Sequence, residues 1–220
     1  MAGSMTSFTS VLGRALDVSG ISLDADTVSS LGSVAAELEK WNKKINLTAL
    51  RDYEDIAAKH FVDSLVLAFR LPERCCLLDV GSGAGFPAIP ISLVRPDVVV
   101  TSIDAVAKKI ACQRHIVRLL GLANFTAKHI RVESLMRSAR FDVIVSRAFS
   151  DLGLFVKLSV SLLADHGHLI AMKGPAVDEE LEGARSVLAE HGMIVGERHR
   201  YELPFGRGVR HLVCLHKSTN

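Results

Sequence analysis

A glycine-rich turn is the segment of this 220-residue chain whose residues are best suited to bind a small molecule. An apolar strand runs into the turn, and a helix follows, in the order Leu77-Leu78-Asp79-Val80-Gly81-Ser82-Gly83-Ala84-Gly85-Phe86-Pro87. Glycine adopts positive φ and lets the backbone approach a ligand closely. Proline suits the first turn of a helix because its missing N–H costs nothing there. A strand, a glycine turn and a helix in this order indicate a nucleotide-type site.

The spacing of the glycines separates the possible cofactors. A dinucleotide site needs Gly-x-Gly-x-x-Gly, which requires glycine at position 86, where this chain has Phe86. The turn also lacks the Gly-Lys-Ser/Thr ending of a P-loop. Gly81, Gly83 and Gly85, with Asp79 just before them, resemble the first motif of class I S-adenosylmethionine-dependent methyltransferases. That resemblance implies S-adenosyl-L-methionine as cofactor and S-adenosyl-L-homocysteine as product.

Two further acids follow predicted strands. Asp104 comes directly after the strand predicted over 98–103, where a carboxylate can accept both ribose hydroxyls of an adenosine. The alternative for Asp104 is an N-cap on the helix predicted over 108–120. We favour the ribose role because the spacing fits a nucleoside site. Val132 and Glu133 precede a loop and are placed to contact the adenine, and the alternative for Glu133 is a solvated surface acid.

Arg147 and Lys173 are the candidate catalytic residues. Arg147 directly follows the apolar residues 143–145, so we expect it at the sheet edge where cofactor and substrate meet. Its alternative role is a salt bridge to Asp142 or Asp151. Lys173 ends another predicted strand and can contact a phosphate or the base, and its alternative is a surface lysine.

His60 and Asp63 lie one helical turn apart in the N-terminal part of the chain. They are candidates to face the cleft from that part. The alternative is a hydrogen bond that joins the N-terminal helices to the rest of the protein.

The absence of certain residues after Val145 limits which acceptor atom the protein can methylate. Methylation at cytosine C5 needs a cysteine nucleophile, and none lies in the loop after Val145. Exocyclic amine methylation typically shows Asn/Asp-Pro-Pro-aromatic at this point, where the chain has Ser146-Arg147-Ala148-Phe149-Ser150. A ring nitrogen such as guanine N7 has a free lone pair, so positioning and desolvation can supply most of the rate. His166 and His168 lack a third ligand, so we interpret them as loop residues and expect no metal site.

The secondary structure that must position these residues is predicted to differ before and after Pro72. After it, short apolar runs alternate with helical patterns, which is typical of βαβ units and a mostly parallel sheet. Strands are predicted over 76–80, 98–103, 141–145, 168–172, 193–196 and 211–215, with helices over 108–120 and 152–163. Before it, helical spacing predicts helices over 31–45 and 55–68 and a shorter one around 11–16, without a strand. We therefore predict the α/β class, with an N-terminal helical subdomain over 1–72 and a Rossmann-like domain over 73–220.

The net charge of +2 hides an uneven distribution. Residues 108–147 contain nine cations against two acids, about +7. The nine are Lys108, Lys109, Arg114, Arg118, Lys128, Arg131, Arg137, Arg140 and Arg147. A second basic group comprises Arg198, Arg200, Arg207, Arg210 and Lys217. A basic surface around a nucleoside cleft indicates a polyanionic substrate. Aromatic residues make up only 5%, so a structured RNA held through its phosphates fits better than extensive base stacking.

The sequence also bears on cellular location. No apolar run reaches the roughly 18–20 residues of a membrane span, and residues 1–9 lack the features of a signal peptide. We expect a cytoplasmic protein. The four cysteines form no Cys-x-x-Cys pair, so we expect buried, reduced thiols.

Motifs along most of the chain resemble the bacterial small-subunit (16S) ribosomal RNA guanine-N7 methyltransferases, also known as glucose-inhibited division protein B. They are Trp41-Asn42-Lys43-Lys44-Ile45-Asn46-Leu47-Thr48, His60-Phe61-Val62-Asp63-Ser64, the glycine turn with its extension to Pro90, Arg131-Val132-Glu133, Ser146-Arg147-Ala148, Lys173-Gly174 and Arg210-His211-Leu212-Val213. The resemblance implies a Rossmann-like fold with an N-terminal helical extension and methylation of a guanine in the decoding region. It implies cofactor contacts from Gly81, Phe86, Val132, Glu133 and Arg147, with Asp104 on the ribose. Ala88 departs from the family, which commonly has glycine there, and this is a small change at a helix start.

Three other functions remain open at this point. The chain can be a class I methyltransferase acting on another RNA, or on a small molecule or a protein, and the basic stretch disfavours the last two. It can be a non-catalytic RNA-binding module, which the intact glycine turn and Asp104 disfavour. A nicotinamide dehydrogenase is weakened by Phe86. The expected partner is small-subunit ribosomal RNA or the small ribosomal subunit, and without heptads or an apolar edge we expect a monomer.

Overall fold

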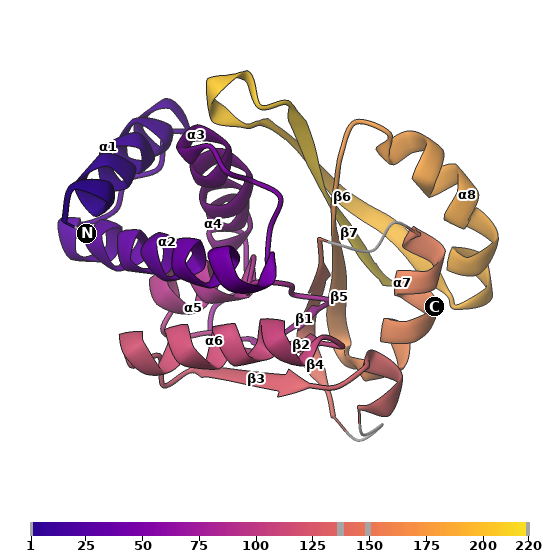
Figure 1. Cartoon of the computed structure of the whole chain (residues 1–220). Helices are drawn as coiled ribbons and strands as arrows, with labels where there is room; N and C mark the ends of the chain where they lie inside the picture. Colours follow the sequence, from indigo (N-terminus) through magenta and orange to yellow (C-terminus); the bar gives the residue numbers. More distant parts are fainter. Residues whose placement is uncertain (1, 136–138, 148–150, 219–220) are drawn as a thin grey trace.

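Seven strands form one sheet in the computed structural model, which describes residues 2–135, 139–147 and 151–218. The strand order is β3-β2-β1-β4-β5-β7-β6 (Figure 1). The strands are β1 (Cys76–Val80), β2 (Val99–Asp104), β3 (Phe125–His129), β4 (Phe141–Ser146), β5 (Leu163–Lys173), β6 (Met193–Glu202) and β7 (Val209–Lys217). The first five pair in parallel, whereas β7 is antiparallel to both β5 and β6. The predicted α/β class with a mostly parallel sheet is confirmed.

Helices cover both faces of the sheet, because side chains of a strand alternate between its two faces. Leu77 and Val143 belong to the hydrophobic cluster that includes α5 (Ala88–Val94) and α6 (Ala107–Leu120). Their neighbours Leu78 and Ile144 belong to the cluster of α7 (Leu152–Ser159) and α8 (Val177–Glu190). Figure 1 shows the two pairs of helices on opposite sides of the sheet.

The N-terminal helices extend the first of these layers. They are α1 (Ala2–Val18), α2 (Ala25–Ile45), α3 (Tyr53–Ile56), a π-helical turn (Ala57–Val62) and α4 (Asp63–Ala68). Helix α2 begins where the Asp24 side chain accepts the Thr27 N–H at 2.7 Å and ends at Asn46, whose φ is +49°. Apolar side chains of α1, α2 and α4 share one buried cluster with α5, α6 and the sheet. The division of the chain at residue 72 therefore stays a prediction, because the core is continuous across it.

Several elements differ from the predictions. The strand expected before Glu133 had no predicted bounds; it is β3, which ends at His129 and buries only two side chains. Helix α8 was not predicted, because it buries only Val177, Ala184 and Leu188. Helix α1 has 17 residues and is not the short helix expected around 11–16. Helix α7 ends at Ser159, and a short 3-10 turn (Val160–Leu162) leads directly into β5.

The predicted C-terminal strands are too short. Strands β6 and β7 have 10 and 9 residues, and the 3-10 turn Pro204–Gly206 joins them into a long hairpin. His166 and His168 lie within β5, so their interpretation as loop residues is wrong. Cys76 is exposed, so the prediction of buried thiols is wrong there, although all four cysteines are free thiols. Arg137 and 148–150 lie outside the described residues. None of the described helices is both long and apolar enough to cross a membrane.

Candidate functional site

The candidate site lies where the order of the strands reverses. Strand β1 has β2 on one side and β4 on the other, so the connections from β1 and β4 leave in opposite directions and open a crevice beyond their carboxyl ends. The glycine turn follows β1 and Arg147 follows β4. Lys173 is the last residue of β5, the next strand. The topology therefore brings the principal sequence candidates to one edge of the sheet.

The glycine turn is held close to β2. Gly81, Gly83 and Gly85 have φ values of +73°, +61° and +99°. The N–H groups of Gly81 and Ser82 both donate to the Ile103 carbonyl, at 3.0 and 3.1 Å. A Cβ at Gly85 would lie 2.4 Å from Ile89 Cδ1, so this glycine lets α5 pack closely. A Cβ at Gly83 would meet no described heavy atom within 4 Å, which leaves the backbone there open to a ligand.

A buried polar network supports the turn from beneath. Ser102 Oγ lies 2.6 Å from both Ser82 Oγ and Gln113 Oε1. Gln113 Nε2 donates to Ser82 Oγ and to the Gly83 carbonyl, both at 2.8 Å. The sequence analysis missed this network. Its signal was a glutamine at position 113, three residues from both Ile110 and Ile116 on the buried side of α6.

Asp104 connects the turn to the next helix. One carboxylate oxygen accepts the Gly83 N–H at 2.9 Å and the other accepts the Val106 N–H at 2.8 Å. The N-cap of α6 is Val106, so the alternative of Asp104 as the N-cap is wrong. Lys109 Nζ lies 3.8 Å from this carboxylate. The structure therefore places an acid at the end of β2, directly beside the glycine turn.

Asp79 lies below the turn and is almost fully buried, at 1% exposed. Its carboxylate accepts the Ala88 N–H at 3.3 Å, at the first turn of α5. Burial raises the pKa of Asp79 to about 7, and the Arg147 charge opposes this increase. The position of Asp79 is suited to supporting the junction between the turn and α5.

Arg147 is fixed by the N-terminal helices. Its guanidinium donates to the Lys59 carbonyl at 2.6 Å and to His60 Nδ1 at 3.2 Å, and lies 3.5 Å from the Asp63 carboxylate. The partner carboxylate is thus Asp63, and the alternative with Asp142 or Asp151 is wrong. Asp142 accepts the Cys76 N–H and Asp151 caps α7. Lys59 and His60 belong to the π-helical turn, a feature frequent at functional sites.

His60 and Phe86 join the two parts of the protein. Their rings stack with centroids 4.5 Å apart, and the Arg147 guanidinium lies 5.7 Å from the Phe86 ring centre. Burial, with a contribution from the Arg147 charge, lowers the pKa of His60 to about 3. His60 is therefore neutral at pH 7. Because Nδ1 accepts from Arg147, Nε2 carries the hydrogen and donates to Thr48 Oγ1 at 3.1 Å.

Asp63 is also held from the far end of the sheet. The Tyr201 hydroxyl, on β6, donates to Asp63 Oδ1 at 2.7 Å. Burial raises the pKa of Asp63, while Arg147 and Tyr201 favour its charged form. Burial and the adjacent carboxylate also raise the pKa of Tyr201. His60 and Asp63 thus line the cleft and also form the hydrogen bonds that link the N-terminal helices to the sheet, so both interpretations of this pair hold.

A cleft of about 400 Å³ contains these groups. It is lined by Lys59, His60, Asp63, Arg147, Met172, Lys173, Gly174 and Arg210. Lys173 is 6% exposed and its Nζ lies 2.5 Å from the Glu180 carboxylate, so the alternative of a surface lysine is wrong. Arg210, which the sequence placed in a basic group and in a motif of the family resemblance but not among the site residues, lines the cleft. The cleft therefore brings together Arg147 after β4, Lys173 at the end of β5 and Arg210 on β7.

Val132 and Glu133 lie in a short 3-10 turn (Val132–Ser134) after β3. Val132 is 6% exposed and belongs to the same buried cluster as Val80 and Ile103 at the ends of β1 and β2. Glu133 is exposed. No cluster of three metal-ligating side chains occurs in the part of the chain that the structure describes.

Comparison with known proteins agrees with this geometry. The family model "rRNA small subunit methyltransferase G" matches residues 28–211. A relative named ribosomal RNA small subunit methyltransferase G from Geobacter sp. (strain M21) is 48% identical over 90% of this chain and 93% of its own length. The protein of the same name from Geotalea uraniireducens (strain Rf4) is 46% identical over 91% and 93%.

Solved structures share the fold at much lower identity. A SAM-dependent methyltransferase from Aquifex aeolicus has a TM-score of 0.56 at 22% identity and covers 80% of this chain and 97% of its own. A precorrin-6y C5,15-methyltransferase from Geobacter metallireducens has a TM-score of 0.55 at 14% identity, over 79% and 92%. The sheet order, the glycine turn and the family match together show that the chain belongs to the rRNA small subunit methyltransferase G family.

Proposed function

We propose that this chain transfers a methyl group from S-adenosyl-L-methionine to N7 of a guanine in the decoding region of small-subunit (16S) ribosomal RNA. The observation that carries the proposal is the juxtaposition of an open glycine turn, backed by Asp104, with the cationic cleft. Family membership supports ribosomal RNA as the acceptor, because the relatives are named for it. The finer choice of guanine N7 rests on the absence of a cysteine nucleophile or an amine-binding motif after β4.

The residues present fit an adenosine-containing cofactor. The open backbone at Gly83 allows close approach. Each oxygen of Asp104 accepts one N–H in this structure, and a carboxylate has about four acceptor sites, so capacity remains for ribose hydroxyls. We assign the contacts with the adenine to Val132 and Glu133. We assign contacts with the cofactor through the backbone of the turn to Gly81 and Gly85. Asp79 and Phe86 act from beneath and beside the turn, because both side chains are buried.

When bound, the cofactor supplies an electrophilic methyl group on a sulfonium. Guanine N7 offers a lone pair and no proton to remove, so the chain needs no general base. Its task is to orient the base and exclude water. Arg147 is held rigidly by three partners, and we assign it and Lys173 to positioning the guanine and the adjacent phosphate. Arg210 adds a third cation to the cleft. The neutral His60 keeps the Arg147 guanidinium in place as an acceptor.

We infer that the partner is small-subunit ribosomal RNA or the small ribosomal subunit, that the enzyme acts as a monomer, and that it works in the cytoplasm. The basic edge formed by α6 and β3 supports an RNA partner. Lys108, Arg118, Lys128 and Arg131 are exposed there without an ion pair to any described carboxylate. In the second basic group, by contrast, Arg198, Arg200 and Arg207 are already paired with acids.

The proposal is tested with purified protein, methyl-labelled S-adenosylmethionine and small ribosomal subunits from cells that lack the gene. Labelled 7-methylguanosine in the digested rRNA is the expected product. Label in another nucleoside, or in protein only, would contradict the assignment. Subunits from cells that carry the gene are the control, because their guanine is already methylated.

A further inference from the structure

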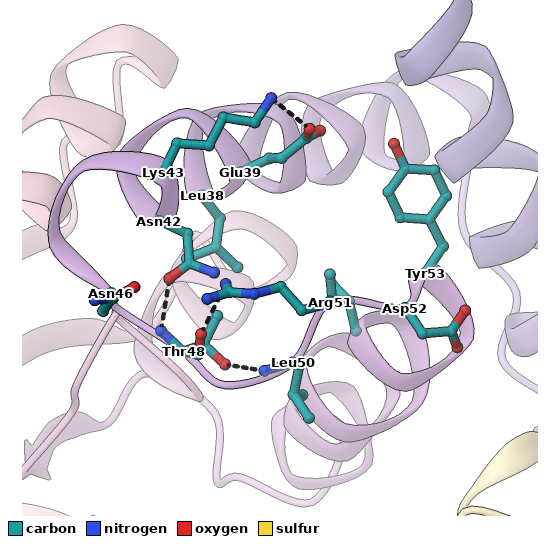
Figure 2. A pocket seen from close by; sticks show the side chains of 11 residues that line it. Leu38, Glu39, Asn42, Lys43, Asn46, Thr48, Leu50, Arg51, Asp52 and Tyr53 are labelled. Atoms are coloured by element: carbon teal, nitrogen blue, oxygen red, sulfur yellow. Dashed lines mark hydrogen bonds and ion pairs between the residues drawn. The ribbon is translucent and has the colours of Figure 1, made fainter.

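A second cavity lies among the N-terminal helices, outside the cleft described above. Its volume is about 610 Å³, within the range of small-molecule sites. Its walls come from the carboxyl-terminal half of α2, the loop 46–52 and the start of α3 (Figure 2). Asn42, Lys43, Asn46 and Thr48 of the family-like stretch 41–48 lie in these walls, and the methyl-transfer site proposed above gives that stretch no role beyond the hydrogen bond between Thr48 and His60.

The lining combines apolar surface with the amide donor of Asn42, a residue that is largely buried. Leu38, Leu50 and Ile56 supply the apolar part. Asn42 is 7% exposed, and its Oδ1 accepts the Thr48 N–H at 3.0 Å, which fixes the orientation of the amide. The described residues offer no acceptor to its Nδ2. An amide donor that has no acceptor in the described part of the chain and lies on the wall of an open cavity is suited to a ligand with an acceptor.

Among the charged residues that line the cavity, Arg51 is the one cation without an ion pair to a described carboxylate. Glu39 pairs with Lys43 at 2.9 Å, and Asp52 pairs with Arg207 at 3.2 Å. Arg51 is exposed and donates to the Thr48 carbonyl at 3.1 Å, and no described carboxylate lies within ion-pair distance of it. Figure 2 shows its side chain between α2 and the Thr48–Leu50 turn. An anionic group at this point would meet an arginine without a competing acid.

The cavity and the catalytic cleft share a wall. Thr48 lines the cavity and His60 lines the cleft, and the two side chains are hydrogen-bonded at 3.1 Å. His60 in turn contacts Arg147. The cavity and the cleft are therefore neighbours, close enough for adjacent nucleotides of one strand to occupy both.

We propose that this cavity binds a second nucleotide of the same RNA strand, close to the guanine that is methylated. The base lies against the apolar walls with an acceptor on Asn42 Nδ2, and its phosphate lies on Arg51. The inference rests on the proposed rRNA substrate. The position of the cavity beside the cleft proposed for the RNA, together with Arg51, which pairs with no described carboxylate, favours a nucleotide of the substrate strand over a protein segment.

The experiment measures the Kd for small ribosomal subunits from cells that lack the gene, by filter binding, and the Kd for S-adenosylmethionine by calorimetry. Arg51→Gln should raise the subunit Kd about fivefold and make the slope of log Kd against log salt shallower by about 0.7, the value for one phosphate contact with a single strand. Asn42→Asp keeps the acceptor for Thr48 and removes the donor, and should raise the Kd about tenfold. Neither should change the cofactor Kd.

Arg185→Gln is the matched control, because Arg185 is exposed on α8, on the other face of the sheet, and loses the same charge. It should change the subunit Kd less than about twofold. If wild-type protein methylates the subunits but Arg51→Gln and Asn42→Asp bind like Arg185→Gln, the second-nucleotide site is wrong. A loss of cofactor affinity in either variant would show a structural role and would also overturn it. If the wild type does not methylate the subunits, the proposed function itself fails.

Discussion

Asp104 has one role in holding the glycine turn and a second, proposed role in binding the cofactor. In the structure it braces the turn through Gly83, and in the proposed complex it also accepts the ribose hydroxyls. Each carboxylate oxygen accepts one N–H in the structure and has a further acceptor site, so Asp104 can brace the turn and bind the ribose at the same time. The sequence indicated the acid, but only the structure shows that it contacts the turn.

Asp104→Ala should weaken S-adenosylmethionine binding by roughly 10- to 100-fold, because a hydrogen bond to a charged group contributes about 1.5–3 kcal/mol. Calorimetric titration measures the effect. Asp178→Ala removes an exposed acid of α8 and serves as the control. An unchanged affinity in Asp104→Ala would limit Asp104 to its contacts with Gly83 and Val106.

Two buried groups give stability opposite dependences on pH. The pKa of Asp79 is raised to about 7 from about 3.9, so the folded state holds a proton that the unfolded state has lost, and this group makes stability fall as pH rises from about 4 to about 7. The pKa of His60 is lowered to about 3 from about 6.5, so the unfolded state gains a proton first, and this group makes stability fall as pH drops from about 6.5 to about 3.

Removing the titratable side chain of either Asp79 or His60 should reveal the pH dependence of stability that the other residue contributes. Asp79→Asn should lose stability more steeply than wild type between pH 7 and pH 4.5, because only the His60 dependence remains. His60→Gln should show the reverse and be less acid-sensitive than wild type. Urea denaturation at pH 7 and pH 4.5 measures the free energy of unfolding. Parallel pH profiles of all three proteins would contradict the assignment of these protonation states.

At the scale of elements, the β6–β7 hairpin fastens the N-terminal helices to the sheet. Arg207, just after the hairpin turn, lies 2.9–3.2 Å from the carboxylates of Asp52, Glu54 and Asp55. The Arg14 guanidinium lies 5.6 Å from the centre of the Phe205 ring in the same turn. Figure 1 shows the hairpin reaching the helices near α3. Because the π-helical turn that follows α3 holds Arg147, this contact also supports the cleft that Arg147 lines.

Arg207→Ala should lower the free energy of unfolding by about 1 kcal/mol at low salt and less at high salt, since the pairs are partly exposed and screened. Amide hydrogen exchange over residues 53–62 should become faster. Arg200→Ala is the control, because Arg200 pairs only with Glu202 on its own strand among the described residues. Equal exchange over 53–62 in the two variants would show that the hairpin does not hold this segment.

The sequence predicted the central strands and the glycine turn well because their burial on both faces produces continuous apolar runs. It gave no bounds for β3, an edge strand that buries only two side chains, and it missed α8, which buries three. Strand-end residues such as Asp104 and Arg147 were predictable from topology alone. The partners of Arg147 were not, because Lys59, His60 and Asp63 are more than 80 residues away and approach it through a hairpin contact and a π-helical turn.

At the scale of the whole molecule, the net charge of +2 understates the attraction for RNA. Four exposed cations without an ion pair to a described carboxylate, Lys108, Arg118, Lys128 and Arg131, lie on or next to α6 and β3, whereas Arg198 and Arg207 of the second basic group are paired with acids. If these four contact phosphates, log Kd for small subunits should change with log salt with a slope of about 3, at about 0.7 per contact. Filter binding between 50 and 200 mM salt measures it. A slope magnitude below about 1 would contradict a basic RNA-binding edge.

Cleavage of cellular rRNA tests most directly the proposal that this protein places the methyl group on guanine N7 of small-subunit rRNA. Borohydride followed by aniline cleaves RNA at 7-methylguanosine. Small-subunit rRNA should be cut in the decoding region in wild-type cells, should remain uncut there in cells that lack the gene, and should be cut again when the gene is restored. An identical cleavage pattern with and without the gene would contradict the account.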